Sequence, residues 1–251
     1  MEKLLELKDV SLIYHTLNDE ITAIKDLNMY CYSGDFVSII GPSGCGKTSI
    51  LSLISGLIKP SSGEILFEGK KDFNHKENLG YMLQKDHLLP WRTIEKNVYL
   101  PLEIKDKNTE ENKIYAKNLL DKYGLKDFKK SYPYQLSGGM RQRAALIRTL
   151  VSNPKLLLLD EPFSALDYQT RLSVCDDVYK IIKAEKKTAV LVTHDISEAI
   201  SMSDVIIILS DRPAKVKSSY VLSIKGDSPL KRRESPEFSL WFEKIWKELN
   251  K

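Results

Sequence analysis

The residues best suited to chemistry form a continuous stretch of glycines, a lysine and hydroxyl groups near the start of the chain. Residues 41–48 read GPSGCGKT and follow an apolar run that ends at Ile40, which is the strand–loop–helix context of a phosphate-binding P-loop. Glycine backbones turn their N–H groups toward an anion, and the positive end of the following helix adds to that field. A turn that binds nothing is the plain alternative, but the complete pattern favours phosphate binding. The predicted binding residues are Gly41, Pro42, Ser43, Gly44, Cys45, Gly46, Lys47, Thr48 and Ser49.

Two adjacent acids, Asp160 and Glu161, follow the apolar run 156–159. A buried strand would deliver both acids to the sheet edge at which α/β folds bind ligands. There Lys47 would reach the β- and γ-phosphates, while Asp160 and the Thr48 hydroxyl would hold Mg²⁺. Glu161 is the candidate to orient and deprotonate an attacking water. Adjacent acids alone could be a solvated turn, but beside a complete P-loop they indicate phosphoryl transfer.

Two further polar residues end predicted strands. Gln84 follows the strand 80–83, and His194 follows the strand 188–193. We expect both to point toward the γ-phosphate, Gln84 as a ligand of the metal or water and His194 as a partner of the phosphate and Glu161. A single histidine at a strand end is usually a structural capping residue, so this prediction depends on the whole set.

A second anion cradle is predicted far from the first, where residues 136–142 read LSGGMRQ. Ser137 is a suitable N-cap, and Gly138 and Gly139 expose backbone N–H groups at the start of a helix. The chain nevertheless has one lysine–threonine pair and one candidate metal carboxylate. We therefore expect the second cradle to bind the nucleotide of a second copy, in a two-fold dimer that holds two nucleotides between its subunits.

An aromatic residue, Tyr14, lies just before a polar loop in the first predicted sheet. Every nucleobase offers a π-face on which such a ring can stack. Packing of Tyr14 on the small sheet explains its position equally well, and its position alone leaves both interpretations open.

The surrounding chain must supply elements that bring these residues together. Strands are expected at 4–10, 22–32, 35–40, 64–67, 80–83, 156–159, 188–192, 205–209 and 215–224. Helices are expected at 49–57, 93–104, 109–123, 140–151, 169–184 and 196–202. The helical stretch from about 88 to 152 indicates an inserted subdomain. Strands that alternate with helices predict an α/β fold with a largely parallel sheet.

Composition narrows the class of protein. The chain has 251 residues, a net charge of +4 and a charged fraction of 29%, as in a globular protein with one large core. Its apolar runs are far shorter than the roughly 20 residues that cross a bilayer, and the N-terminus has no signal-like apolar region. Three cysteines without paired spacing suit a reducing compartment. The basic run 231–233 is expected to be a solvated turn, and nucleic-acid binding is not expected.

The C-terminal segment is expected to contain a polar linker, 225–234, and then a helix, 236–249. One face of this helix would present a set of large apolar side chains, namely Phe238, Trp241, Phe242, Ile245, Trp246 and Leu249. The ordinary interpretation is a helix docked on the core. The alternative is an interfacial membrane helix, although the polar face is not strongly basic.

Taken together, the motifs resemble the ATP-binding subunits of ATP-binding cassette (ABC) transporters along essentially the whole chain. The matched segments are the Walker A at 41–48, the Q-loop Gln84, the signature at 136–142, the Walker B acids, the D-loop at 164–167 and the H-loop His194. The resemblance implies that Tyr14 stacks on adenine and that Ser137, Gly138 and Gly139 contact the γ-phosphate of ATP on the partner chain. It also assigns nucleotide contacts to Gln142 and to Asp167 of the D-loop.

The resemblance further implies the fold and its organisation. The expected fold is a P-loop NTPase (RecA-like) core with an N-terminal antiparallel β-subdomain and an inserted α-helical subdomain. Residues 1–87 and 153–251 would form the core with its β-subdomain, residues 88–152 the helical signature subdomain, and residues 236–250 a C-terminal helix. The chain would be one Mg²⁺-dependent ATPase domain with Glu161, His194, Gln84 and Lys47 as its catalytic residues.

Within this family, residues 82–94 (MLQKDHLLPWRTI) and the C-terminal helix look like the importer subunits of the nitrate, sulfonate and taurine group. This likeness implies an ATPase that powers import of a small solute, at the cytoplasmic face of the membrane. Its partners would be a second cassette, in a homodimer or heterodimer, a transmembrane permease and an extracytoplasmic solute-binding protein. The alternatives are an ABC ATPase that acts on DNA or ribosomes, an exporter cassette, and a P-loop kinase or GTPase, which would leave the signature unexplained.

Overall fold

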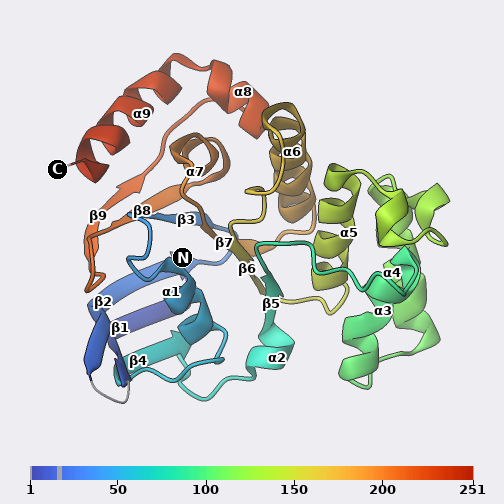
Figure 1. The fold of residues 1–251 in the computed structure, drawn as a ribbon, viewed down its shortest axis with the longest axis horizontal. Helices are drawn as coiled ribbons and strands as arrows, with labels where there is room; N and C mark the ends of the chain where they lie inside the picture. Colours follow the sequence, from blue (N-terminus) through green and yellow to red (C-terminus); the bar gives the residue numbers. More distant parts are fainter. Residues whose placement is uncertain (1, 16–18, 251) are drawn as a thin grey trace.

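In the computed structural model, which describes residues 2–15 and 19–250, two sheets and a set of helices form the molecule (Figure 1). The strands are β1 (Lys3–His15), β2 (Glu20–Tyr32), β3 (Phe36–Ile40), β4 (Ser62–Phe67), β5 (Leu79–Met82), β6 (Leu156–Asp160), β7 (Thr188–Val192), β8 (Val205–Leu209) and β9 (Val216–Val221). The helices are α1 (Lys47–Ile54), α2 (His75–Asn78), α3 (Ile94–Ile104), α4 (Glu110–Lys122), α5 (Gly138–Leu150), α6 (Tyr168–Ala184), α7 (Ile196–Met202), α8 (Pro229–Glu234) and α9 (Pro236–Leu249).

The larger sheet has the strand order β5-β6-β7-β3-β8-β9, with every neighbouring pair parallel except β8 and β9. Strands β3, β6 and β7 are buried along their whole length, which explains their continuous apolar sequences. The smaller sheet is antiparallel with the order β2-β1-β4. These observations confirm the predicted α/β fold with an antiparallel β-subdomain.

The two faces of β6 pack into different parts of the core. Leu157 and Leu159 face a cluster that includes residues of α5 and α6, while Leu156 and Leu158 face a cluster with α1 and the small sheet. Figure 1 shows the same layers, with α7 and α9 on one side of the large sheet and α1 with β1, β2 and β4 on the other. The period of two along a strand therefore places the small sheet and the long helices on opposite faces.

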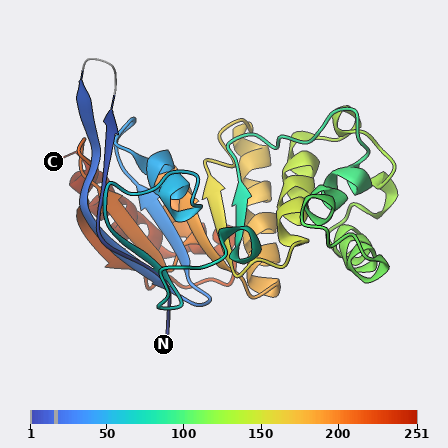
Figure 2. The same cartoon turned by 90° about the horizontal axis from the view of Figure 1, so that it is seen from below.

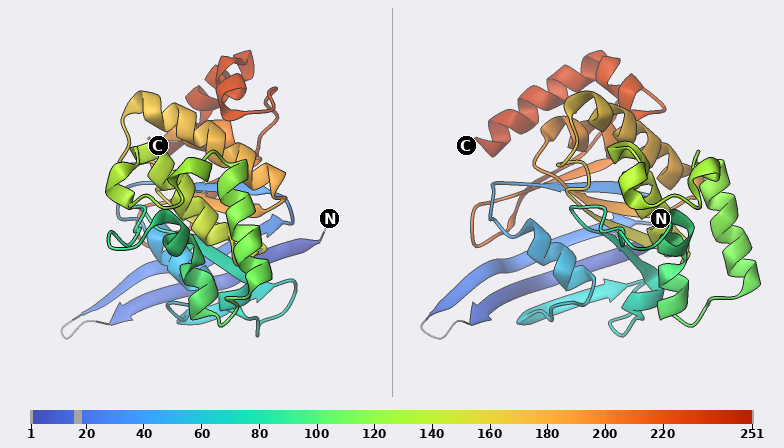
Figure 3. Two further views of the ribbon diagram at one scale, coloured as in Figure 1. Left: turned by 90° about the vertical axis from the view of Figure 1, so that its right-hand side faces the viewer. Right: turned by 45° about the vertical axis from the view of Figure 1, so that its right-hand side comes forward.

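Helices α3, α4 and α5 lie together at the end of the molecule opposite to β1 and β2 (Figures 2 and 3). Thr93, Thr109 and Ser137 cap these three helices, each accepting a hydrogen bond from a backbone N–H of the first turn. An ion pair joins this helical group to α6, because Lys122 Nζ lies 2.7 Å from Oε1 of Glu185. The boundaries 1–87, 88–152 and 153–251 stay predictions.

The C-terminal region corrects two predictions. The expected linker 225–234 contains helix α8, so the basic run is not a solvated turn, and Nη1 of Arg232 donates to the carbonyl of Ser203 at 2.9 Å. Helix α9 packs on the core through Ile245, which is fully buried, with Phe238, Trp241 and Leu249 beside it. Phe242 and Trp246 lie off this face, stacked on one another and exposed. A side chain on the flank of an amphipathic stripe does not reach the core.

Smaller differences concern the ends of elements. Helix α1 begins at Lys47 and ends at Ile54, so Leu57 lies beyond it with 71% of its surface exposed. Strand β1 continues past a register shift near Asp9, whose φ is 48°, as far as His15. Within the described ranges 2–15 and 19–250, no helix combines the length and apolar character needed to traverse a bilayer.

Candidate nucleotide-binding site

The P-loop connects the end of β3 to the start of α1. Gly46, the residue before the helix, has a φ of 121°, a conformation that glycine adopts without the strain of a side chain. The Lys47 side chain is buried, and its ammonium donates to the carbonyls of Gly41 and Pro42 at 2.8 and 2.9 Å. The lysine charge is thus held over the loop whose N–H groups would meet a phosphate.

The end of β6 brings a carboxylate to the same loop. Thr48 Oγ1 donates to Oδ1 of Asp160 at 3.3 Å, and the Tyr81 hydroxyl donates to Oδ2 at 3.4 Å. Burial raises the pKa of Asp160, and the hydrogen bonds from Thr48 and Tyr81 oppose that rise. A hydroxyl and a buried carboxylate beside a phosphate cradle are hard oxygen donors, which is the ligand chemistry that Mg²⁺ prefers.

Glu161 has a strained backbone, with a φ of 43° in the left-handed region. Strand β7 holds this residue from the side, because the N–H of Glu161 donates to the carbonyl of Val192 at 2.9 Å. The His194 ring follows the same strand, and its Nδ1 lies 3.0 Å from Oε2 of Glu161. The structure therefore brings the predicted base and the predicted histidine into direct contact.

Gln84 and Tyr14 each contact one serine close to the residues described above. Nε2 of Gln84, after β5, lies 3.5 Å from Oγ of Ser164, at the limit of a hydrogen bond. The Tyr14 hydroxyl and Oγ of Ser49 are 3.0 Å apart, so the ring of Tyr14, on β1, lies near the start of α1. Tyr14 is 37% exposed, which leaves part of the ring open to solvent.

The signature residues lie at the start of α5, on a different helix from the P-loop. Strands β5 and β6 lie between α1 and α5, the helix that Ser137 caps (Figures 1 and 2). A Cβ on Gly139 would lie 2.8 Å from Cγ2 of Val174, which shows how closely α5 approaches α6 here. Gln142 is 3% exposed, and its expected contact with a nucleotide stays a prediction.

Three further polar residues make contacts close to the site. Oδ1 of Asp167 accepts from the N–H of Thr170 at 3.0 Å and caps α6, and the expected contact of Asp167 with a nucleotide stays a prediction. Tyr81 was missed, although its hydroxyl donates to Asp160. Ser164 was named only as part of the D-loop, and its contact with Gln84 was not foreseen. Tyr81 carries a hydroxyl on the strand beside the one that ends at Asp160. The sequence does not show that these two strands are neighbours, because this depends on the pairing of β5 with β6.

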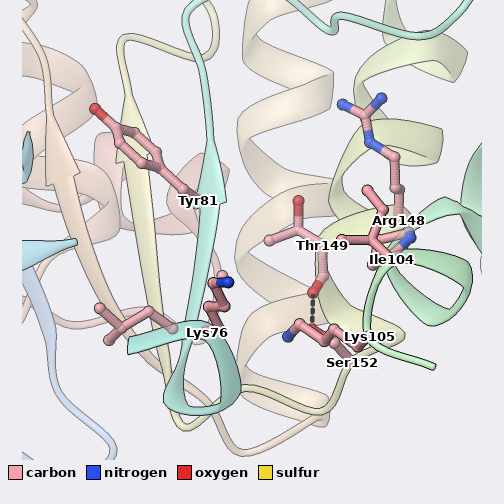
Figure 4. A pocket seen from close by; sticks show the side chains of 10 residues that line it. Lys76, Tyr81, Ile104, Lys105, Arg148, Thr149 and Ser152 are labelled. Carbon is pink, nitrogen blue, oxygen red and sulfur yellow. Dashed lines mark hydrogen bonds between the residues drawn. The ribbon is translucent and has the colours of Figure 1, made fainter. Parts of the chain in front are cut away.

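A groove of about 400 Å³ lies where the core meets the helical group (Figure 4). Its walls come from α2 and the edge strand β5 on one side and from α3 and α5 on the other. Ile104 is 72% exposed, and the ammonium groups of Lys76 and Lys105 add positive charge. Burial lowers the pKa of Lys105, and nearby Lys107 adds to that effect. An occupant of this groove would touch both parts of the molecule.

The parallel sheet, the P-loop and the acids at the end of β6 together define a P-loop nucleoside triphosphatase. Comparison with known families is more specific, because the model of the family described as ABC transporter matches residues 24–164. The chain belongs to the ABC transporter family. It is an ATP-binding cassette of the class that hydrolyses ATP.

Individual relatives agree with this assignment. The chain is 50% identical over 248 residues to the uncharacterized ABC transporter ATP-binding protein YtlC of Bacillus subtilis (strain 168), covering 98% of this chain and 95% of YtlC. It is 38% identical to the aliphatic sulfonates import ATP-binding protein SsuB of Bacillus anthracis, covering 84% of this chain and 82% of SsuB. Among solved structures, the dimeric post-hydrolysis state of the ATP-binding cassette MJ0796 bound to ADP and Pi has a TM-score of 0.71, with 31% identity over 87% of this chain and 99% of that one.

Proposed function

We propose that this chain is the ATP-hydrolysing subunit of an importer for a small solute, with anionic, sulfonate-like or nitrate-like compounds as the class to test first. The observation that carries the ATPase chemistry is the contact of His194 with Glu161 beside the P-loop. The likeness to a sulfonate-import ATPase supports the importer and the solute class. The motif at 82–94 supports the same group.

In this proposal the P-loop N–H groups and Lys47 bind the β- and γ-phosphates of ATP. Thr48, Asp160 and Gln84 would hold Mg²⁺, which neutralises the charge that develops on the transferred phosphoryl group. Glu161 orients the attacking water and accepts its proton, while His194 holds Glu161 and the γ-phosphate. Tyr14 stacks on the adenine ring.

The proposed active unit is a dimer of cassettes. Ser137, Gly138 and Gly139 stand at the start of α5, and β5 and β6 separate this helix from α1 (Figures 1 and 2). This separation supports a role of the three residues toward the nucleotide of a second copy. The dimeric state of the MJ0796 structure supports the same arrangement. Closure of two copies around two ATP molecules would complete each site, and hydrolysis would reopen it.

The groove of Figure 4 is proposed to seat the permease. Its occupant would be a short cytoplasmic segment of that membrane protein carrying acidic side chains, because Lys76 and Lys105 line the groove. Contact with both the core and the helical group would pass movement between them to the permease. The chain would then lie at the cytoplasmic face of the membrane, held through its partner.

Two measurements test the importer function. The tagged chain is purified from its native membranes in mild detergent and its partners are identified, and uptake of labelled taurine, an alkanesulfonate and nitrate is compared in cells with and without the chain. We expect a polytopic permease to co-purify, together with loss of uptake of one solute. Recovery of ribosomal or DNA-bound proteins without a membrane protein would refute the transport function and favour the other ABC ATPases.

A further inference from the structure

One arginine on helix α6 contacts two of the loops that surround the proposed active site. Nη2 of Arg171 donates to the carbonyl of Leu166, inside the D-loop, at 3.0 Å. Nη1 lies 3.6 Å from Oδ2 of Asp195, and Nε lies 3.9 Å from Oε1 of Glu198. Both acids follow His194 closely in the chain. A single guanidinium thus lies between the D-loop and the segment that carries the histidine.

Glu198 makes this arrangement costly to disturb. Its side chain is 4% exposed, and burial raises its pKa, with Thr193 and Arg171 acting in the opposite direction and Asp195 in the same one. The Thr193 hydroxyl donates to Oε2 of Glu198 at 2.6 Å. A buried carboxylate is tolerated when a cation and hydrogen bonds compensate it. Arg171 is a cation that faces it.

The connection to the histidine is covalent and short. Thr193 precedes His194 directly, and the N–H of Asp195 donates to Oγ1 of Thr193 at 3.0 Å. Asp195 also caps α7, since its Oδ1 accepts from the N–H groups of Ser197 and Glu198. The backbone on either side of His194 is therefore held by groups that Arg171 faces.

The D-loop end of the connection is equally close to functional residues. Ser164 Oγ donates to the carbonyl of Glu161 at 3.0 Å, and Leu166 packs near the signature, with its Cδ2 at 3.0 Å from where a Cβ on Gly138 would lie. A displacement of the signature helix would therefore move Leu166. The carbonyl of Leu166 is the group to which Arg171 donates its hydrogen bond.

We propose that Arg171 is a positioning residue that ties the D-loop to the segment bearing His194, so that the arrangement of the D-loop sets how His194 is held against Glu161. This inference rests on the proposed roles of Glu161 and His194. Arg171 touches no nucleotide in this proposal and acts through the two loops. Its guanidinium suits the task because one rigid, permanently charged plane donates a hydrogen bond to the Leu166 carbonyl and lies within ion-pair distance of the carboxylates of Asp195 and Glu198.

The test compares Arg171→Met and Arg171→Lys in the full chain, with Lys180→Met as the control on the same helix. Lys180 is exposed and pairs with Asp176, away from both loops. ATPase kcat, the Kd of a fluorescent ATP analogue, Tm and hydrogen exchange by mass spectrometry are measured. We expect Arg171→Met to lower kcat about 10- to 100-fold with Kd within about twofold, since misplacement of a catalytic group costs rate and not ground-state binding.

Further readouts separate positioning from general destabilisation. Amide exchange is expected to rise in peptides 161–168 and 193–199 and not in the P-loop peptide, and Arg171→Lys is expected to recover part of kcat. Combining Arg171→Met with Glu198→Gln should lower Tm by less than the sum of the two changes, because the second removes the unpaired buried charge.

An unchanged kcat in Arg171→Met would overturn the proposal, as would a kcat that falls only in step with Kd and Tm without recovery in the lysine variant. Glu161→Gln is measured alongside. If that variant hydrolyses ATP like the parent chain, the proposed role of Glu161 fails, whatever Arg171→Met does, so the two failures are distinguishable.

Discussion

Nδ1 of His194 lies 3.0 Å from Oε2 of Glu161, and the backbone N–H of that same glutamate donates to Val192, two residues before the histidine. Strand β7 and its extension thus hold Glu161 at both its backbone and its side chain. The positive φ of Glu161, 43°, is maintained by these contacts. A glutamate held in this way keeps its carboxylate directed into the site.

Replacing Glu161 by glutamine removes the proton acceptor and leaves the size of the side chain unchanged. We expect ATP binding within about twofold of the parent and kcat lower by about 10²–10⁴-fold, the usual contribution of a general base. Steady-state phosphate release and binding of a fluorescent ATP analogue measure the two quantities. Parent-like turnover would show that another group activates the water.

Removal of the Lys47 ammonium should weaken the binding of ATP. We expect Lys47→Ala to weaken ATP binding by at least about 1.5–3 kcal/mol, the value of a hydrogen bond to a charged group, because the variant lacks the cation beside the phosphates. Isothermal titration calorimetry measures the change, with Lys180→Ala as a matched surface control. Equal affinity of Lys47→Ala and the parent would contradict the placement of the phosphates.

The two interpretations of Tyr14 predict different results. If the ring stacks on adenine, Tyr14→Ala should weaken ATP binding by about 1–3 kcal/mol, while Tyr14→Phe, which lacks only the hydroxyl near Ser49, should bind almost normally. Fluorescence anisotropy with labelled ATP distinguishes them. A lower Tm in Tyr14→Ala with unchanged affinity would instead identify a ring that packs on the small sheet.

Charge reversal in the groove of Figure 4 tests the proposed permease seat. Lys105→Glu should repel an acidic segment and weaken retention of the permease about tenfold, equivalent to ~1.4 kcal/mol. Lys126→Glu, on the helical group outside the groove, is the control and should retain it. Quantitative co-purification measures both. Equal recovery of the permease by the two variants would exclude an acidic occupant.

The ion pair between α4 and α6 predicts a dependence of stability on pH. Burial alone would raise the pKa of Glu185, but hydrogen bonds from Lys122 and Tyr123 outweigh it and hold the pKa below its ordinary value of 4.5. A carboxyl group with a lowered pKa in the folded state stabilises the fold at pH values above its ordinary pKa. This stabilisation is lost as the pH falls through the lowered pKa.

We therefore expect Glu185→Gln to lower the free energy of unfolding by about 1 kcal/mol at pH 7, a value discounted because the lysine is exposed. The difference in unfolding free energy between the variant and the parent should shrink below pH 4.5. Urea unfolding at pH 7 and pH 3.5 provides the comparison. A difference that stays constant across this range would mean that Glu185 acts through packing and not through its charge.

The sequence was most informative where a local pattern contains the chemistry. The GPSGCGKT loop and the acids after β6 could be placed because strand, loop and helix are neighbours in the chain. Contacts that depend on which strands pair in the sheet could not be predicted from the sequence. Tyr81 meets Asp160 only because β5 pairs with β6, and nothing in either segment specifies that pairing.

Burial caused the other differences. Gln142 is 3% exposed, although the polarity of its side chain alone would place it at the surface. Arg232 lies in a run of three charges that looked solvated, yet it donates to Ser203. Charged and amide side chains have enough length to reach buried carbonyls, so their polarity does not report their environment.

The order of the large sheet has a consequence for how the protein is made. Strand β7 lies between β6 and β3, although β3 and β6 both precede it in the chain. While the chain emerges from the ribosome, the phosphate loop and Asp160 are present before the strand that joins their two strands exists. Long-range pairing of this kind forms late, because distant segments must first be brought together. We expect a nascent chain that ends before β7 to expose both edges of β3 and one edge of β6, because β7 and β8 are missing, and to hydrolyse no ATP. The ATPase would then be silent until synthesis has passed the histidine.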